Sequence, residues 1–184
     1  MALVALVAIG AAWPAISKAI GLQVLPAGSS SVGSENFTDG ACSAGSQGVT
    51  LVADFGTASK RKPLIRCAIG FDGSVSAAAT GWALFSAAGV DVAGTEQYPQ
   101  GFVCRIDGLP NAKQQPCTST PTVAQGSWVY FTSSNGSAWH FAMQGAAMSH
   151  PACGDFQGWR FVVPADGTGV GGPRVKAASF RCAK

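Results

Sequence analysis

The clearest alternation of apolar and polar positions lies in residues 128–161, which hold three of the five tryptophans and both histidines of the chain. Inside this stretch, Asn135–Gly136 is typical of a two-residue β-hairpin turn, because both residue types accept the positive φ angles that such a turn needs. We therefore predict a hairpin centred on this pair, followed by a third strand over residues 158–163. The expected cross-strand pairs are Tyr130 with Phe141 and Trp128 with Met143.

Side chains alternate between the two faces of a strand, so the predicted hairpin has one strongly aromatic face. The residues expected on that face are Trp128, Tyr130, Trp139, Phe141 and Met143, and those expected on the other face are Val129, Phe131, His140 and Ala142. In the third strand, Trp159, Phe161 and Val163 share one side. Large aromatic side chains bury much apolar area, so we interpret the aromatic face as the core of a small sheet. The alternative is an exposed binding surface.

The remaining apolar patterns predict more strands and one helix. Strands are expected at residues 49–55 and 63–70, joined as a hairpin by a polar turn. Ser74 is a candidate N-cap for a helix over residues 75–89 that ends at Gly89 and carries its apolar side on Ala78, Trp82 and Phe85. Shorter patterns predict strands at residues 102–107 and 175–182, and a short strand or an extended link at residues 90–95. Several strands with a single helix indicate the α+β class.

The first part of the chain has a different composition. Residues 2–13 form an uncharged apolar run that is too short to span a bilayer comfortably. We expect residues 1–25 to be a signal peptide or, alternatively, a retained N-terminal anchor. Residues 26–48 are rich in Gly, Ser and Ala and are expected to form a flexible spacer. Residues 49–184 then suffice for a single domain, since 47% of the chain is hydrophobic.

The six cysteines indicate the compartment. Their number is even and none forms a C-x-x-C pair, which favours disulfides in an extracellular protein over a zinc site. Six cysteines allow 15 pairings, and spacing alone does not choose among them. Cys104 and Cys117 flank the same turn-rich segment, so we expect them to pair. The other expected pairs are Cys42 with Cys67 and Cys153 with Cys182.

Charge and motif content argue against several function classes. The only basic run, residues 60–62, lacks interleaved aromatics, so no nucleic-acid partner is expected. His140 and His150 are the only imidazoles, and neither lies in a catalytic motif. The aspartates near strand ends are expected to cap turns. We therefore expect no catalytic residue, no metal site and no enzyme activity, and a membrane contact only through the N-terminal anchor.

Several segments resemble a family of secreted actinobacterial proteins of poorly characterised function. That family is similar to the C-terminal, β-grasp-like domain of the cobalamin carriers transcobalamin and intrinsic factor. The resemblance implies a small β-grasp-like sheet with one packed helix, stapled by disulfides, and a binding or accessory role near cobalt or cobalamin uptake, with cobalamin as ligand. The segments that carry it are residues 49–56 (VTLVADFG) and 101–110 (GFVCRIDGLP), Cys117 with Pro121, Trp128 with Tyr130, Trp139, and residues 158–161 (GWRF).

Two functions follow from these observations. The first is a small-molecule or corrinoid-binding module tied to uptake, and the second is a cell-envelope protein that binds glycan or protein through exposed aromatics. For the first, ligand contacts are expected on loops carried by the rigid sheet. His140 is either an outward polar residue or a contact to a corrinoid or metal, as its lower axial ligand or through a hydrogen bond. The expected ligand contacts are Asp107, Asn135, Trp139 and His140.

Overall fold

The computed structural model of the protein describes residues 36–168 and 170–183. The expected signal peptide or anchor, residues 1–25, lies outside this range, as do residues 26–35 of the expected spacer. The rest of that expected spacer belongs to the fold instead. Residues Phe37–Asp39 form strand β1, which pairs with a strand of the main sheet, and Cys42 is buried.

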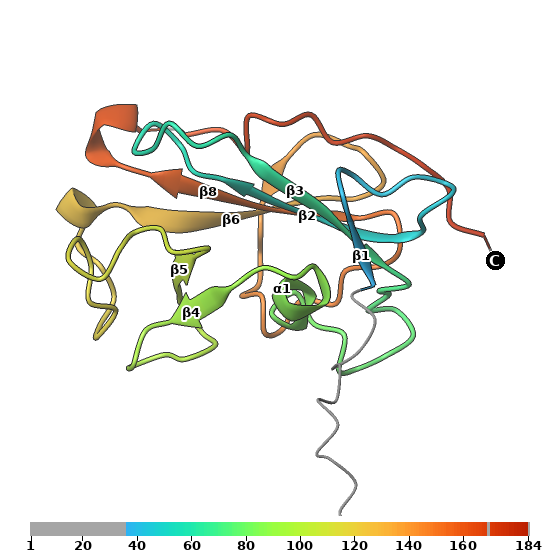
Figure 1. The fold of residues 1–184 in the computed structure, drawn as a ribbon, viewed down its shortest axis with the longest axis horizontal. Helices are drawn as coiled ribbons and strands as arrows, with labels where there is room; N and C mark the ends of the chain where they lie inside the picture. Colours follow the sequence, from blue (N-terminus) through green and yellow to red (C-terminus); the bar gives the residue numbers. More distant parts are fainter. Residues whose placement is uncertain (1–35, 169, 184) are drawn as a thin grey trace, which may run out of the picture. The chain divides into compact units, whose positions relative to one another are not determined.

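A six-stranded sheet forms the centre of the domain (Figure 1). Two strands, β4 (Val92–Gly94) and β5 (Val103–Ile106), form a separate antiparallel pair. The helix α1 spans Ala83–Ala87, and short 3-10 helices lie at Val123–Gln125 and Pro164–Asp166. Across the main sheet the strands are β1 (Phe37–Asp39), β3 (Leu64–Ile69), β2 (Gly48–Asp54), β8 (Phe156–Val162), β6 (Ser127–Ser133) and β7 (His140–Phe141).

The strand order confirms the small α+β, β-grasp-like fold. β2 and β3 form an antiparallel hairpin, α1 follows, and β6 and β8 form a second antiparallel pair. The first strand of the first pair, β2, lies beside the last strand of the second, β8, and runs parallel to it. This central arrangement of the two pairs, with β1 and β7 added as edge strands, is that of a β-grasp domain.

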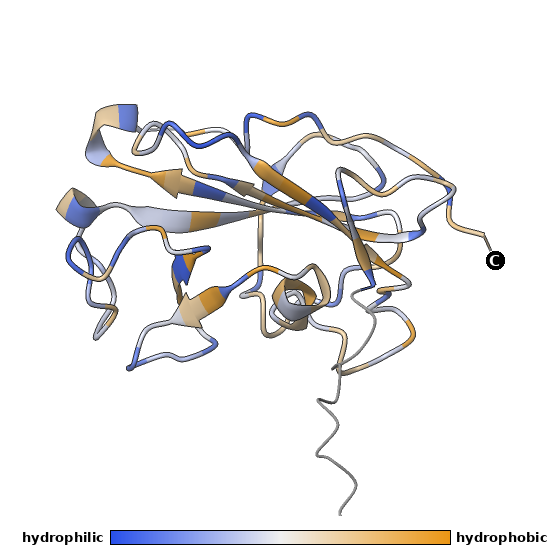
Figure 2. Cartoon of the chain, viewed as in Figure 1, coloured by the Kyte–Doolittle hydropathy of each residue, from blue (hydrophilic) through white to orange (hydrophobic). Residues whose placement is uncertain are grey.

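The sheet buries a different cluster of residues on each face. On one face, α1 and the β4–β5 pair cover the strands, as Figure 1 shows. Figure 2 shows apolar stretches along the strands, whereas the long connection from β5 to β6 is mainly hydrophilic. The larger cluster includes Val49, Leu51, Phe55, Leu84, Phe85, Trp128, Trp159 and Phe161. The smaller cluster on the other face consists of Val52, Phe156 and Ala177, with Ile65, Trp139 and Val175 packed against it.

The helix is shorter than the pattern predicts. It begins at Ala83, and residues 75–82 form turns and irregular structure in which Ala78 is exposed. The reason is a competing set of backbone partners, because the N–H groups of Gly81 and Trp82 donate to Ser149 and Ala146 at 2.9 and 3.0 Å. The predicted end at Gly89 is confirmed. Its φ of 62° lies in the left-handed region, and it follows the last helical turn as a C′ residue.

The hairpin forms, but its register differs by one residue from the prediction. Asn135 and Gly136 have φ angles of 50° and 75°, and the Ser137 N–H donates to the Ser134 carbonyl, so the turn is where the sequence places it. However, Phe141 pairs with Phe131 rather than Tyr130. The segment that returns from the turn to β7 contains one residue more than expected, which shifts the pairing by one position. Because side chains alternate along a strand, this shift moves each side chain of the returning strand to the opposite face of the sheet.

The exchange changes where the aromatic residues lie. Trp128 and Tyr130 point to the larger cluster, as do Trp159 and Phe161 of β8, which confirms the predicted face of these two strands. Trp139 was expected beside them and instead packs against Phe156 on the opposite face, with ring centroids 6.2 Å apart. Met143 was expected in the core and is 95% exposed.

No closing strand forms over residues 175–182. Among the described residues of this segment the backbone makes no strand ladder, and the segment crosses the face of the sheet opposite α1 (Figure 1). Ala177 is buried there, and Val175 accepts a hydrogen bond of 2.7 Å from the Trp139 indole. The tail thus acts as a cover for the smaller cluster.

All three expected disulfides are present, at Cys42–Cys67, Cys104–Cys117 and Cys153–Cys182. The first ties the loop after β1 to β3, and the last ties the C-terminal tail to the loop before β8. Three disulfides in a domain of this size are typical of an oxidising environment outside the cell. Within the described residues, none of the helices is long and apolar enough to cross a bilayer.

Candidate ligand-binding groove

A groove of about 400 Å³ opens beside the first half of β6. One wall is the segment that follows β7, and the other is the loop that leads into β5. The sheet contributes the floor through β6 and β8. The lining residues are Gln100, Gly101, Phe102, Val103, Trp128, Val129, Tyr130, Phe141, Ala142, Met143, Gln144, Gly145, Ala146 and Trp159.

The floor of the groove is aromatic and rigid. The Tyr130 ring stacks on the Trp159 indole with centroids 4.4 Å apart and an interplanar angle of 11°. Trp159 in turn contacts Phe85 of α1 at 5.6 Å, so the floor is continuous with the larger core cluster. Because these rings are held from below by core packing, the floor keeps its shape without a ligand.

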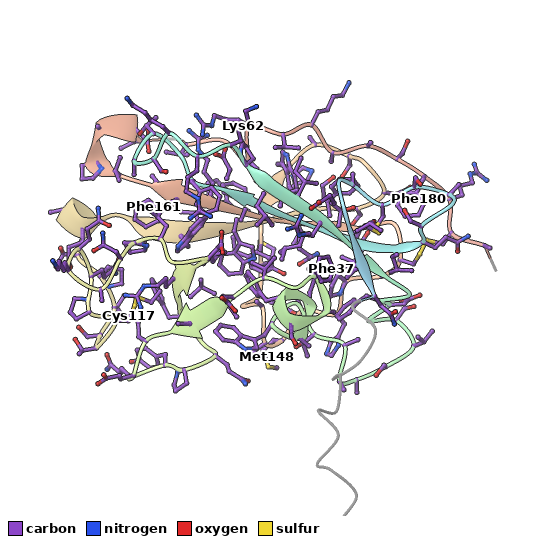
Figure 3. All side chains as sticks on the ribbon, viewed as in Figure 1. Phe37, Lys62, Cys117, Met148, Phe161 and Phe180 are labelled. Atoms are coloured by element: carbon purple, nitrogen blue, oxygen red, sulfur yellow. A yellow bond between two sulfur atoms is a disulfide. The ribbon has the colours of Figure 1, made fainter. Side chains whose placement is uncertain are left out.

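The rim is unusually apolar for a surface. Met143 is 95% exposed, and Phe141 of the same wall is 57% exposed, although its ring packs against Phe131 on the other face of the sheet with centroids 4.7 Å apart. Met148, in the loop just beyond this wall, is also exposed and projects near α1, whereas Lys62 lies on the opposite side of the sheet (Figure 3). Contiguous exposed apolar side chains are a mark of interaction sites.

The groove contains no charged side chain, since none of its lining residues is Asp, Glu, Lys, Arg or His. The polar side chains among its lining residues include the amides of Gln100 and Gln144. The Tyr130 hydroxyl points away from the groove into the fold. That hydroxyl donates to Gln157 Oε1 and lies 2.8 Å from Ser149 Oγ. Burial raises the pKa of Tyr130 to about 12, so the phenol stays neutral at physiological pH and offers no catalytic base.

The expected contact residues do not form one site. Asp107 lies in the tight turn after β5, where Arg61 forms an ion pair with its carboxylate and donates a 2.8 Å hydrogen bond to its carbonyl. This turn lies at the start of β6, because the Trp128 indole donates to the neighbouring Leu109 carbonyl at 3.0 Å. Asn135 follows the other end of β6, which at the usual rise of a strand is about 20 Å away.

The other expected contacts serve the fold or face solvent. Asn135 forms the hairpin turn, and its backbone N–H donates to Asp155. Trp139 is half-buried under the C-terminal tail. His140 and His150 are both exposed. The described residues contain no group of three or more His, Cys, Asp or Glu side chains placed to hold a metal ion.

The residues of the groove were missed for a physical reason. Phe141 and Met143 were assigned to the core because their spacing matches a strand face, and the register shift removes them from it. Gln100 and Gln144 lie in loops that carry no motif. The sequence does signal part of the site, because Trp128, Tyr130 and Trp159 of the predicted aromatic face line the groove. Met143 also lines it, in a Gly- and Ala-rich loop directly after a strand.

Comparison with known families gives one partial match. The family described as the SCO2322-like domain matches residues 123–183, which include β6, β7, β8 and the C-terminal tail. Searches of curated proteins and of solved structures each found no match. The resemblance to cobalamin carriers therefore receives no support from these comparisons. The matched segment contributes the floor of the groove and the wall with Phe141 and Met143, whereas the wall with Gln100 comes from outside it.

Proposed function

We propose that the chain is a secreted or surface-attached, non-catalytic binding module whose ligand occupies the groove beside β6. The observation that supports this most directly is the combination of a rigid Tyr130–Trp159 floor with an exposed apolar rim. Ligand sites are typically concave, mostly apolar and provided with a few polar groups that orient the ligand. The three disulfides fit a protein that works outside the cell.

The lining chemistry selects an uncharged ligand. A charged group transferred into this groove would lose water and find no counter-ion, which is unfavourable. A corrinoid, the ligand implied by the resemblance, carries carboxamides around its ring, and the Gln100 and Gln144 amides are suitable partners for such groups. A groove of about 400 Å³ holds part of such a ring, so this chain would act with a second protein or domain in uptake.

A second candidate is a cell-envelope protein that binds glycan through exposed aromatics. Two aromatic residues support it: Phe141, whose ring packs against Phe131, is 57% exposed, and Tyr98, in the loop before β5, is 49% exposed. Sugar rings stack on such faces.

Titration calorimetry of the full chain with cobalamin, cobinamide and cell-wall glycan fragments tests the proposal. Gly145 lines the groove, and a Cβ added there would meet no atom within 4 Å, so we expect Gly145→Phe to obstruct the groove without unfolding the domain. Gly171→Phe is the matched control, because that glycine is equally open and lies outside the groove. Binding that is lost in the first variant and kept in the second supports the groove as the site. Equal binding by both variants would overturn it.

A further inference from the structure

The edge strand β7 covers only part of β6. β6 pairs with β8 along its whole length, from Ser127 to Ser133. On its other side, β7 pairs with Phe131 and Thr132, and the N–H of Ala142 then donates to the Tyr130 carbonyl at 3.0 Å. After Ala142 the chain leaves the sheet, and residues 143–146 form one wall of the groove. On this side, the first half of β6 therefore has no paired strand among the described residues.

The uncovered backbone belongs to Trp128. In an antiparallel strand, the N–H and C=O groups of every second residue point to the same neighbour. Because the Tyr130 carbonyl faces β7, both backbone groups of Trp128 face the same side, where β7 no longer runs. Trp128 is therefore a non-hydrogen-bonded position in the ladder with β8, and outside the strand ladders no described residue donates to its carbonyl or accepts from its backbone N–H. The groove thus presents one donor and one acceptor from a single strand residue.

We propose that the groove binds an extended, uncharged peptide segment, which adds to β6 as an edge strand beside Trp128. This inference rests on the proposed function, since it names the class of partner for the same groove. A peptide residue opposite Trp128 would donate to its carbonyl and accept from its N–H, as in other cases of strand addition. Side chains of the peptide would contact the Tyr130 ring and the exposed Met143 side chain, whereas the Phe141 ring lies on the other face of the sheet against Phe131.

The chemistry of the groove favours a peptide over a glycan here. A donor and an acceptor on one residue match the donor and acceptor of a peptide residue in spacing and direction, whereas sugar hydroxyls require no such pairing. The lack of charge in the lining complements a neutral segment. The free edge is also short, which limits non-specific strand pairing and leaves specificity to the side-chain contacts.

Hydrogen exchange measured by NMR on the full chain gives the direct test. The probe is an acetylated and amidated seven-residue peptide, selected against the protein from a displayed library of Ala, Val, Thr, Ser, Gln and Phe. Without peptide, the Trp128 amide should exchange fast and the neighbouring Val129 amide, which faces β8, slowly. With saturating peptide, exchange at Trp128 should slow at least about tenfold while Val129 stays unchanged. N-methylation of alternate peptide residues should weaken binding by about tenfold or more, and methylation of the residues between them should not.

Each other outcome is decisive. A Trp128 amide that is already protected in the free protein overturns the proposal, as does a selected peptide that binds without slowing its exchange. If no peptide binds but a glycan or corrinoid does, and Gly145→Phe abolishes that binding, the groove remains the site and only the peptide inference fails. If peptides, glycans and corrinoids all fail to bind, the proposed function fails with it.

Discussion

Arg174 holds the carboxylate of Asp54, 120 residues earlier in the chain, by three hydrogen-bonding groups. Its backbone N–H donates to Oδ2 at 2.8 Å, its Nη2 to Oδ1 at 2.6 Å, and its Nε to Oδ2 at 3.0 Å. Asp54 is fully buried at the end of β2, whereas the Arg174 side chain is 47% exposed. The same guanidinium donates to the Gly56 carbonyl at 3.0 Å. This pair therefore attaches the C-terminal tail to a central strand of the sheet.

Arg174→Met should destabilise the protein by about 3 kcal/mol, because it leaves a buried carboxylate without its partner. Breaking a buried ion pair costs about 3–5 kcal/mol, and we expect the lower value here because the Arg174 guanidinium is half-exposed. Urea unfolding of the purified protein measures it. Lys176→Met is the matched control, since Lys176 is exposed in the same tail, and it should change stability by less than about 0.5 kcal/mol. Equal effects of the two variants would contradict the role of the pair.

The same pair should make stability depend on pH in acid. Burial raises the pKa of Asp54, but the hydrogen bonds from Arg174 and Gly56 outweigh it and hold the pKa below its usual value of 3.8. The unfolded chain therefore binds more protons as the pH falls, so the stabilisation is complete above about pH 4 and is lost as the pH drops toward the lowered pKa. The stability difference between the native protein and Arg174→Met should shrink over this range. A difference that stays constant to pH 2 would refute the assignment.

Removing the Cys104–Cys117 disulfide should cost about 3 kcal/mol, as expected for a closed loop of this length. Its two cysteines are 13 residues apart in sequence, and both are buried. The double variant Cys104→Ser, Cys117→Ser tests this by thermal unfolding. Figure 3 places Cys117 in the loop region beside β4 and β5, away from the main sheet, so the sheet itself should remain intact by circular dichroism. Global loss of β structure would mean that the loop is needed for folding.

The strands and disulfides were predictable because their signals are local. Period-2 apolar patterns place β2 and β3 within a residue of the expected ranges, and Cys104 and Cys117 flank one loop. The helix start was not predictable in this way. Residues 75–82 have an apolar spacing typical of a helix, but the N–H groups of Gly81 and Trp82 find carbonyl partners in the loop after β7. That loop is about 65 residues away in sequence, beyond the reach of any pattern in the segment itself.

The candidate site was harder to predict, because one residue decides which side chains it contains. The turn at Asn135–Gly136 is as expected, but the Ser133 hydroxyl donates to the Ser137 carbonyl at 2.6 Å within an arm that is one residue longer. The extra residue moves Trp139 from the aromatic face to the opposite one. The residues at the turn determine where the chain reverses, but packing determines the register, here through the contact of Trp139 with Phe156.

The Trp139 side chain packs against two glycines where the tail meets the sheet, Gly172 in the C-terminal tail and Gly158 in β8. A Cβ on Gly172 would lie 2.3 Å from Trp139 Cβ, and one on Gly158 would lie 2.6 Å from the edge of the ring. Gly172→Ala should therefore destabilise the protein by about 1–3 kcal/mol, because the atom that it meets cannot move without the backbone. Gly171→Ala is its neighbour and control, with open space around its Cβ, and should be nearly neutral. Differential scanning calorimetry compares the two, and a neutral Gly172→Ala would show that the tail is free to shift.

Trp139 should therefore act on stability rather than on ligand binding. Trp139→Ala should cost about 3 kcal/mol through loss of packing on Phe156, and Trp139→Phe about 1 kcal/mol through loss of the hydrogen bond to the Val175 carbonyl. His140→Ala, in the next position and exposed, should leave stability within about 0.5 kcal/mol. Denaturant melts give these values, and calorimetry with the ligand that the groove binds gives the affinity of each folded variant. An unchanged affinity supports the groove as the ligand site. A tenfold loss of affinity in Trp139→Phe or His140→Ala would instead indicate that the ligand binds at the hairpin.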